Sequence, residues 1–277
     1  MKTLSKIVLS LALGLLVLGL ALGLVAFMMG GSPGAVGENL SQSRFLNFSG
    51  INSRRNNSEV ASIFANQGDV INVYDLASLD FRIGFGEATI ILGERFEVIY
   101  ANEASREHFY HHRSGDTWHI GSQEVRLRGL WGQSRDDLRL TIVIPADFVA
   151  DSAYIAVGAG VLRADMLSAI DLELSIGVGS ATIEAVSAER LRADVGVGEL
   201  RINNCDVSSI NLDVGLGAIE IALTRDVQDY TGQISGGLGN IQIGTSRFAG
   251  IFDSSFGSSD APYRLKVQVG LGSVTIR

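Results

Sequence analysis

Residues 158–217 hold the pattern that decides the fold, and they read GAGVLRADMLSAIDLELSI GVGSATIEAVSAERLRADV GVGELRINNCDVSSINLDV GLG. Each of the three complete units is 19 residues long and opens with a Gly-x-Gly triplet, and a fourth triplet closes the stretch. Further triplets occur at 84–86, 237–239 and 270–272 with irregular spacing. A short period of this kind indicates a stack of small structural units.

Apolar and polar residues alternate on both sides of the triplets, which is the period of a β-strand. We expect the apolar positions to face inward and the residues between them, such as Asp194 and Asp213, to face water. Each unit is therefore predicted to be two short strands joined at a glycine corner. The inward positions form four columns, namely Ile155, Leu174, Ala193 and Leu212; Val157, Ile176, Val195 and Val214; Leu162, Ala181, Leu200 and Ile219; and Ala164, Ile183, Ile202 and Ile221.

The predicted fold class is all-β, a parallel β-solenoid with rungs of about 19 residues, preceded by one N-terminal transmembrane helix. A unit this small cannot bury its own apolar face, so its strands need copies above and below. Glycine suits the corner, because positive φ or the close approach of the next backbone would exclude a Cβ atom. The predicted structural glycine corners are Gly158, Gly160, Gly177, Gly179, Gly196, Gly198, Gly215, Gly217, Gly237, Gly239, Gly270 and Gly272.

A dinucleotide-binding interpretation of the triplets fails on its context. The G-x-G-x-x-G fingerprint needs a third glycine and a helix that follows the turn. No copy in this chain has that third glycine, and strand-like alternation follows each one. No cofactor is therefore predicted.

The N-terminal segment predicts a membrane anchor. Residues 1–6 contain two lysines, and residues 7–29 form an uncharged apolar run, long enough at about 1.5 Å per residue to cross a hydrocarbon core of ~30 Å. The lysines place residues 1–6 in the cytoplasm, which predicts a single-pass protein of the cell membrane with an extracytoplasmic C-terminal domain. Cleavage as a signal peptide is the alternative, because Ala35-Val36-Gly37 is a passable cleavage site. Residues 30–58, rich in Gly, Ser and Asn, predict a flexible linker.

Two further parts are predicted beyond the linker. Residues 59–150 alternate without the 19-residue period and are expected to form irregular N-terminal rungs that cap the stack. Residues 151–277 are expected to form the regular repeats. The stretch Val274-Thr275-Ile276-Arg277 has no covering element after it, so we predict an exposed last sheet edge there, either protected by the arginine or available to another chain.

Composition narrows the choice of partners. The 277 residues are 46% hydrophobic and include 33 glycines but 3 prolines, which fits a folded chain. The net charge of −8 becomes −10 once residues 1–30 are set aside, because that segment holds two lysines and no acid. Nucleic acid is not an expected partner of so acidic a chain, since nucleic-acid affinity comes mostly from cations. The single cysteine excludes an internal disulfide.

All four histidines lie within a short segment, at His108, His111, His112 and His119. The intervening Ser114-Gly115-Asp116 predicts a hairpin turn, which would bring His112 and His119 together across its strands. His108, His112 and His119 are therefore candidate ligands for Zn²⁺. Adjacent His111 and His112 would point to opposite faces, and we favour a polar hairpin surface that binds no metal.

Other reactive groups have structural interpretations. Cys205 falls in the same inward column as Leu167 and Val186, which predicts a buried, inert thiol. Asp194 and Asp213 stack on successive levels and could form a weak Ca²⁺ ladder. Glu173 over Arg192 and Arg201 over Glu220 favour ordinary ion pairs between rungs instead. A polysaccharide-cleaving enzyme is disfavoured, because residues 151–230 contain two aromatic residues and returns too short to wall a cleft.

The strand-repeat segments 140–145 (LTIVIP), 155–160 (IAVGAG), 194–200 (DVGVGEL) and 239–243 (GNIQI) resemble the bacterial putative-adhesin family of β-strand-repeat proteins, a family of unknown function. The resemblance covers residues 60–277. It implies a parallel β-solenoid on the outer face of a bacterial membrane, anchored by one N-terminal helix. It brings no catalytic residues to this chain.

The sequence therefore predicts a non-enzymatic, membrane-anchored module of the cell envelope with a structural or adhesin-like role. Its expected partners are the membrane, through the N-terminal helix, and cell-wall polymer or another envelope protein. The alternative is a sensory or regulatory partner in an envelope-stress signalling system. Catalytic, cofactor-binding and metal-binding residues are not predicted.

Overall fold

A computed structural model of the chain describes residues 69–70, 76–123 and 138–277, which belong to one compact unit. The predicted cytoplasmic segment, membrane span and linker at 1–6, 7–29 and 30–58 lie outside these residues. None of the helices in the described residues has the length and apolar character required to cross a bilayer.

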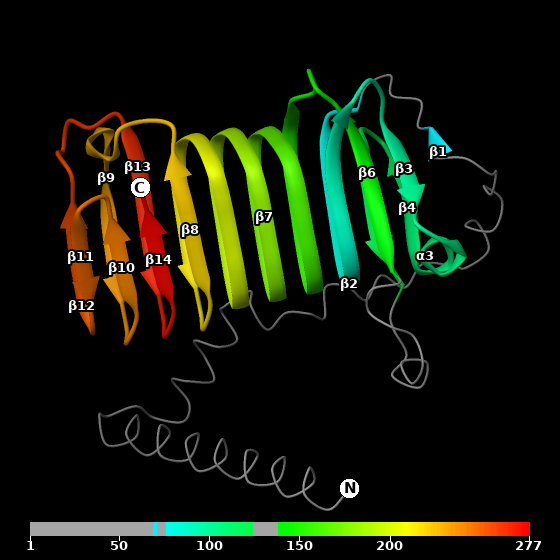
Figure 1. Cartoon of the computed structure of the whole chain (residues 1–277). Helices are drawn as coiled ribbons and strands as arrows, with labels where there is room; N and C mark the ends of the chain where they lie inside the picture. Colours follow the sequence, from blue (N-terminus) through cyan, green and yellow to red (C-terminus); the bar gives the residue numbers. More distant parts are fainter. Residues whose placement is uncertain (1–68, 71–75, 124–137) are drawn as a thin grey trace, which may run out of the picture. The chain divides into compact units, whose positions relative to one another are not determined.

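Strands make up nearly all of the described secondary structure (Figure 1). One short helix, α3, covers Glu103–His108, and a single 3-10 turn, η5, covers Val227–Asp229. The strands are β1 Asp69–Val70, β2 Ser78–Gly93, β3 Glu97–Tyr100, β4 Phe109–Ser114, β5 Thr117–Ser122, β6 Arg139–Pro145, β7 Ala150–Val214, β8 Ala218–Leu223, β9 Tyr230–Gly236, β10 Asn240–Ile243, β11 Ser246–Ala249, β12 Phe252–Phe256, β13 Tyr263–Val269 and β14 Ser273–Ile276.

The strands form one large mixed sheet whose interior pairs are parallel. Its path runs β1-β3-β6-β2-β7-β8-β14-β10-β11. Off this path, β5 pairs with β2 and β4, β13 pairs with β7 and β9, and β12 pairs with β9. Antiparallel pairs occur toward its two ends, at β1–β3, β3–β6 and β4–β5 and again at β10–β11 and β9–β12. The predicted all-β class is therefore confirmed as a large, largely parallel sheet.

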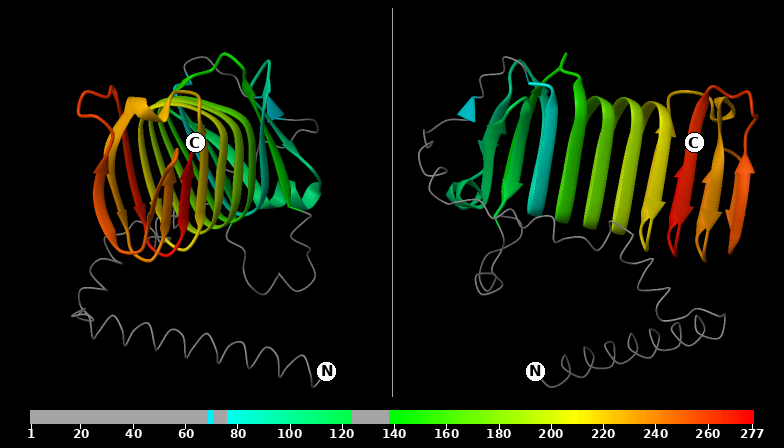
Figure 2. Two further views of the ribbon diagram at one scale, coloured as in Figure 1. Left: turned by 60° about the vertical axis from the view of Figure 1, so that its left-hand side comes forward. Right: turned by 180° about the vertical axis from the view of Figure 1, so that it is seen from behind.

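Strand β7 alone carries three of the aligned repeats, and its ribbon passes through successive turns that lie side by side (Figures 1 and 2). The triplets mark where the turns touch. A Cβ atom added to Gly179 would lie 2.0 Å from the carbonyl oxygen of Gly160, and one added to Gly198 would lie 2.1 Å from that of Gly179. Copies one repeat apart are thus direct backbone neighbours.

The predicted inward columns form the core. All sixteen of those side chains are at most 3% exposed, from Ile155 and Val157 on the first repeat to Ile219 and Ile221 on the last. Trp118 closes the N-terminal end, where the rings of Phe81 and Phe96 meet it edge to face at 5.4 and 5.5 Å. Burial of an apolar side chain contributes about 1.5–3 kcal/mol, so each large column residue adds to the stability of the repeats.

The glycine corners differ in what they require. Positive φ occurs at Gly86 and Gly179, at 115° and 154°, whereas close backbone approach is the common reason. The second glycine of a triplet is the tighter one: a Cβ on Gly217 would lie 2.3 Å from the carbonyl oxygen of Gly198, but one on Gly215 would lie 3.0 Å from that of Gly196.

The prediction of an exposed edge at residues 274–277 is wrong. Strand β14 pairs in parallel with β8 on one side and with β10 on the other. Likewise, β13 lies between β7 and β9. The triplet at 270–272 therefore stacks between the triplets at 215–217 and 237–239, so chain order and spatial order differ. The antiparallel strands β11 and β12 lie outside them as the terminal layer.

The prediction that Asp194 faces water is also wrong in part. Its side chain is on the outward face, but the residue is only 8% exposed. The Arg192 guanidinium covers the carboxylate, with its Nε 2.9 Å from Oδ2 and its Nη2 3.0 Å from Oδ1. A two-pronged ion pair within one strand thus removes the carboxylate from solvent.

Candidate functional site

The histidine-containing hairpin forms as predicted. Strands β4 and β5 pair antiparallel around a two-residue turn at Gly115 and Asp116, and the positive φ of Gly115, 64°, suits that turn. His112 lies directly opposite His119. Their rings stack with centroids 4.8 Å apart and planes 13° from parallel.

The neighbouring strand adds charge to the two imidazoles. His119 Nδ1 lies 3.1 Å from Oδ2 of Asp80 on β2, and Arg82 Nε donates to Oδ1 of the same carboxylate at 2.7 Å. The Arg82 guanidinium in turn lies 5.1 Å from the centroid of the Tyr154 ring on β7. Because β5, β2 and β7 run parallel in register at these positions, outward side chains from three strands meet in one row.

Tyr110 extends this row on the far side of the hairpin. Its ring centroid is 6.2 Å from that of His112. A Cβ on Gly121 would lie 2.5 Å from the Tyr110 hydroxyl oxygen, so the ring crosses the backbone of β5 where no side chain intervenes. Tyr110 is 39% exposed. We call this cluster the hairpin patch: Tyr110, His112, His119, Asp80, Arg82 and Tyr154.

The other two histidines lie apart from the patch. His108 Nε2 lies 3.1 Å from the carbonyl oxygen of Phe85, and the His111 ring meets Trp118 edge to face at 6.4 Å. The structure thus brings together His112 and His119 but not His108. Within the described part of the chain, no three His, Cys, Asp or Glu side chains gather as a group that could hold a metal ion.

Acidification should destabilise the protein through His108. Burial lowers the pKa of its imidazole below the usual 6.5, and the bond to Phe85 offsets this only in part. The unfolded chain therefore binds the proton first as pH falls below 6.5, so the free energy of unfolding falls with pH in that window. Between about pH 7.5 and 5.5, we expect the free energy of unfolding of the wild type to fall more than that of His108→Gln, as measured by urea unfolding. Identical pH profiles for the two proteins would contradict this role.

Ion pairs run across the rungs on the outward face, as the sequence predicted. Arg201 bridges Glu199 at 2.8 Å and Glu220 on the next rung at 3.0 Å, and Arg277 reaches the same Glu220 at 2.9 Å. Arg190 Nη2 bonds Asp171 at 2.6 Å. Exposed pairs of this kind contribute about 0–1 kcal/mol each, so they mainly set the charge pattern of the surface.

Asp213 is a half-buried carboxylate on the same outward face. Burial raises its pKa, and the neighbouring Asp194 raises it further, whereas Arg192 and Lys266 oppose the shift. A raised pKa means that the ionised form destabilises the fold at neutral pH, and that this penalty disappears as pH falls toward the usual 3.8.

Asp213→Asn should therefore stabilise the protein at pH 7. Removing a like charge from a cross-strand neighbour is worth roughly 0.2–1 kcal/mol, or a Tm about 1–4 °C higher. The gain should vanish below about pH 4. Asp171→Asn is the matched control with the opposite sign, because the bond from Arg190 lowers the pKa of Asp171. A lower Tm for Asp213→Asn at pH 7 would show that this carboxylate is stabilising.

Cys205 is buried at 0% exposure, as predicted from its column. Burial is the largest of the effects that raise the pKa of its thiol to about 12. The thiolate needed for nucleophilic or metal chemistry is therefore scarce at neutral pH, and Cys205 is a core residue.

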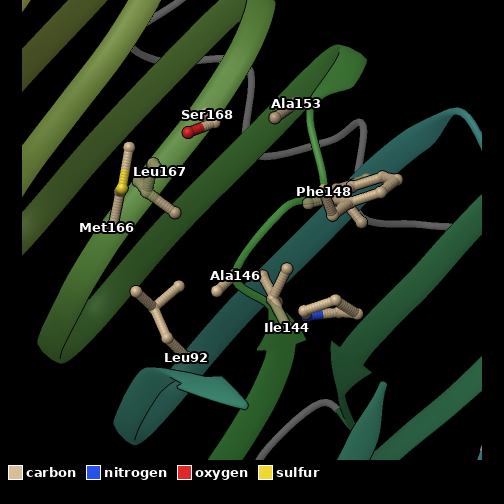
Figure 3. Close-up of a pocket in the computed structure, with 10 residues that line it drawn as sticks. Leu92, Ile144, Ala146, Phe148, Ala153, Met166, Leu167 and Ser168 are labelled. Carbon is tan, nitrogen blue, oxygen red and sulfur yellow. The ribbon is translucent and has the colours of Figure 1, made fainter. Parts of the chain in front are cut away.

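A shallow apolar pocket lies where β6 ends beside β7 (Figure 3). Leu92, Phe148 and Met166 are among its lining side chains, and the space measures about 340 Å³, part of it open to solvent. None of the lining residues is ionisable. The pocket is therefore a shallow apolar surface depression without an acid–base group.

No protein-family model and no curated protein sequence matches the chain. Several solved structures are similar to it, among them three bacterial proteins. They are a putative cell adhesion protein from Clostridium sporogenes (14% identity, 76% of this chain and 97% of that one, TM-score 0.40), a putative adhesin from Bacteroides fragilis (12%, 76% and 96%, TM-score 0.36) and a putative lipid binding protein from Parabacteroides distasonis (11%, 76% and 96%, TM-score 0.33). These comparisons assign no family. The sequence suggested a resemblance to the putative-adhesin family. The comparisons support it only as structural similarity to proteins described as a putative adhesin and a putative cell adhesion protein.

Sequence reasoning identified the histidines of the hairpin patch but not their partners. Asp80, Arg82 and Tyr154 lie far from the hairpin along the chain. The alternation places all three on the outward face, but only the register between β5, β2 and β7 shows that they meet His119.

Proposed function

We propose that the chain is a non-enzymatic, membrane-anchored β-solenoid that stands outside the cytoplasm and acts as a structural or adhesin-like module of the cell envelope. The stacking of the triplets carries this proposal, because it joins all the repeats through backbone hydrogen bonds. Leu216 N donates to Gly196 O at 2.8 Å, Leu271 N to Gly215 O at 2.8 Å, and Leu238 N to Gly270 O at 2.9 Å. A continuous ladder of this kind makes a stiff body that can present surfaces at a distance from its anchor.

The hairpin patch is the surface that we propose for contact with envelope polymer. Aromatic rings beside hydrogen-bonding groups suit sugar recognition, because sugars offer apolar ring faces and many hydroxyl groups. Tyr110 supplies an exposed ring, and Asp80, Arg82 and the two imidazoles supply donors and acceptors. The acidic charge of the rest of the chain disfavours anionic polymer except near Arg82.

Location is tested first, with the full chain expressed in a bacterium. We expect the protein to stay with membranes after carbonate washing. In cells whose outer layers are permeabilised but whose cytoplasmic membrane is intact, added protease should digest residues 60–277. Recovery in the soluble fraction, or protection of the domain in such cells, would overturn the proposal. A shortened chain that begins just after Gly37 would indicate the cleaved signal peptide instead.

Polymer binding is tested with the full chain in liposomes and purified cell wall. The double variant Tyr110→Ala/Tyr154→Ala should weaken cosedimentation by about tenfold, since each aromatic contact is worth about 0.5–1.5 kcal/mol. The matched control is Tyr263→Ala, which removes a tyrosine from the opposite end of the sheet. Equal binding by the wild type, the double variant and the control would show that the hairpin patch does not bind the polymer. Crosslinking in cells that yields one dominant membrane protein would favour the regulatory alternative.

A further inference from the structure

The central residues of the glycine triplets form an exposed apolar row. Five of them are large and aliphatic, and each exposes about half of its surface: Val178 57%, Val197 49%, Leu216 57%, Leu271 49% and Leu238 64%. We call these five residues the apolar ridge. They account for nearly half of the large apolar side chains that are exposed in the described residues.

The ridge is continuous because its residues lie on consecutive levels. Backbone bonds place Leu216 beside the triplet of Val197, Leu271 beside that of Leu216, and Leu238 beside that of Leu271. The close approach of Gly198 to Gly179 places Val197 beside Val178. With about 4.8 Å between levels, five side chains extend roughly 19 Å in a line.

Glycine on both sides leaves the ridge without flanking side chains. The nearest outward residues on one side are Ser180, Glu199, Ala218, Ser273 and Asn240. Glu199, the one acid among them, is paired with Arg201 at 2.8 Å. On this side the ridge is therefore bordered by small or neutralised groups. On the other side the nearest outward acids are Asp194, which Arg192 holds at 2.9 and 3.0 Å, and Asp213, whose charge Arg192 and Lys266 partly offset, so an apolar surface meets the least desolvation cost from the side of Glu199.

The area of the ridge is too small for a stable dimer. Five half-exposed aliphatic side chains offer on the order of 450 Å², against about 800 Å² per partner in a standard protein interface. A surface that is already held nearby needs less area, because tethering supplies an effective concentration in the millimolar range.

We propose that the apolar ridge inserts into the lipid surface of the membrane that carries the chain. This inference rests on the anchoring part of the proposed function. The predicted linker, residues 30–58, follows the predicted span directly, and a flexible coil of that length would have a root-mean-square reach of roughly 30 Å. The domain is thus kept within reach of the bilayer, where a row of aliphatic side chains at the level of the acyl boundary gains contact with lipid.

The experiment uses single-cysteine reporters in the full chain. Cys205 contributes no background, because it is buried and its pKa is raised to about 12. Leu216→Cys reports on the ridge. Glu189→Cys is the control, because Glu189 is exposed and lies about half a repeat from the triplets. Both variants are reconstituted in phosphatidylcholine liposomes and labelled with a charged, membrane-impermeant maleimide. Rates are normalised to those in denaturant after subtraction of the labelling of the wild-type chain, whose one cysteine is Cys205.

We expect Leu216→Cys to be labelled about tenfold more slowly than Glu189→Cys, which corresponds to a ridge that is lipid-bound about nine-tenths of the time. Adding anionic phosphatidylglycerol should weaken this protection, since the chain beyond residue 30 carries a net charge of −10 and an anionic surface repels it. Equal rates in a chain that resists carbonate washing would overturn the ridge inference alone. A chain that washes off would overturn the anchoring proposal and the ridge inference together.

A second copy of the chain is the competing occupant of the ridge, and lipid dilution separates it from the bilayer. Adding lipid at constant protein should preserve the protection of Leu216→Cys if lipid covers the ridge. Protection that falls in proportion to protein density would overturn lipid insertion in favour of self-association. The triple variant Val197→Ser/Leu216→Ser/Leu271→Ser should retain the wild-type Tm but lose protection at a Val178→Cys reporter, whereas persistent protection would contradict insertion.

Discussion

Gly198→Ala should lower the free energy of unfolding by about 3 kcal/mol or more, at the upper end of what overpacking costs. The added Cβ would lie 2.1 Å from the carbonyl oxygen of Gly179, a distance that real Cβ contacts do not reach. Neither atom can move freely, because both belong to the parallel ladder. The rungs must therefore separate locally, and backbone hydrogen bonds of the neighbouring strands must lengthen.

Thermal unfolding of the full chain in detergent measures the effect, and a Tm decrease of about 6–12 °C is expected. Gly215→Ala is the graded control, because its nearest neighbour would be 3.0 Å away and a shift of a few tenths of an ångström suffices. Val197→Ala is the neutral control, since that side chain is 49% exposed. If all three variants unfolded alike, the stacking contact at Gly198 would not be a determinant of stability.

Periodicity alone was enough to predict the core. The four inward columns needed only alternation and the 19-residue repeat, and every member is buried. The same is true of Cys205, which shares a column with Leu167 and Val186. These predictions succeed because a stack gives each position the same environment on every level, so one aligned residue reports on the rest.

The exposure of the apolar ridge was open to prediction but needed one more step. Val195 and Leu200 both face inward and are five residues apart, whereas strict alternation requires an even separation. The phase therefore reverses at the corner, and Val197 is turned outward there. The same offset holds at Ile176 and Ala181 around Val178.

The spatial order of the last levels could not be predicted from local pattern. The triplets at 237–239 and 270–272 have the same signature, and both are compatible with a place after 215–217. Their order depends on pairings between distant strands, such as Val267 with Leu212 on one side and with Ile234 on the other. Alternation specifies which face of a strand is buried, but not which neighbour it pairs with.

Strands β13 and β14 lie between strands that precede them in the chain. Removing them should have a second large effect on stability. In the described sheet, β9 pairs only with β12 and β13, and β10 only with β11 and β14. A chain that ends at Pro262 therefore leaves the layer from β9 to β12 with no partner on the inner side. It also removes five buried side chains, namely Leu265, Val267, Val269, Val274 and Ile276, whose burial contributes on the order of 10 kcal/mol in total.

We expect this truncated chain to keep slow amide exchange in β7 and to lose it in β9 and β10, as measured by hydrogen–deuterium exchange with mass spectrometry. A synthetic peptide of residues 263–277 should restore protection in β9 and β10, because it supplies both missing strands in register. The control peptide carries Val267→Asp, which would bury a charge between β7 and β9 and should not rescue. Slow exchange of β9 in the truncated chain without peptide would mean that β9 can pair directly with β7. Rescue by the peptide would show that the gap between β7 and β9 can form before residues 263–277 fill it. Insertion of β13 and β14 would then be the last step in forming the stack.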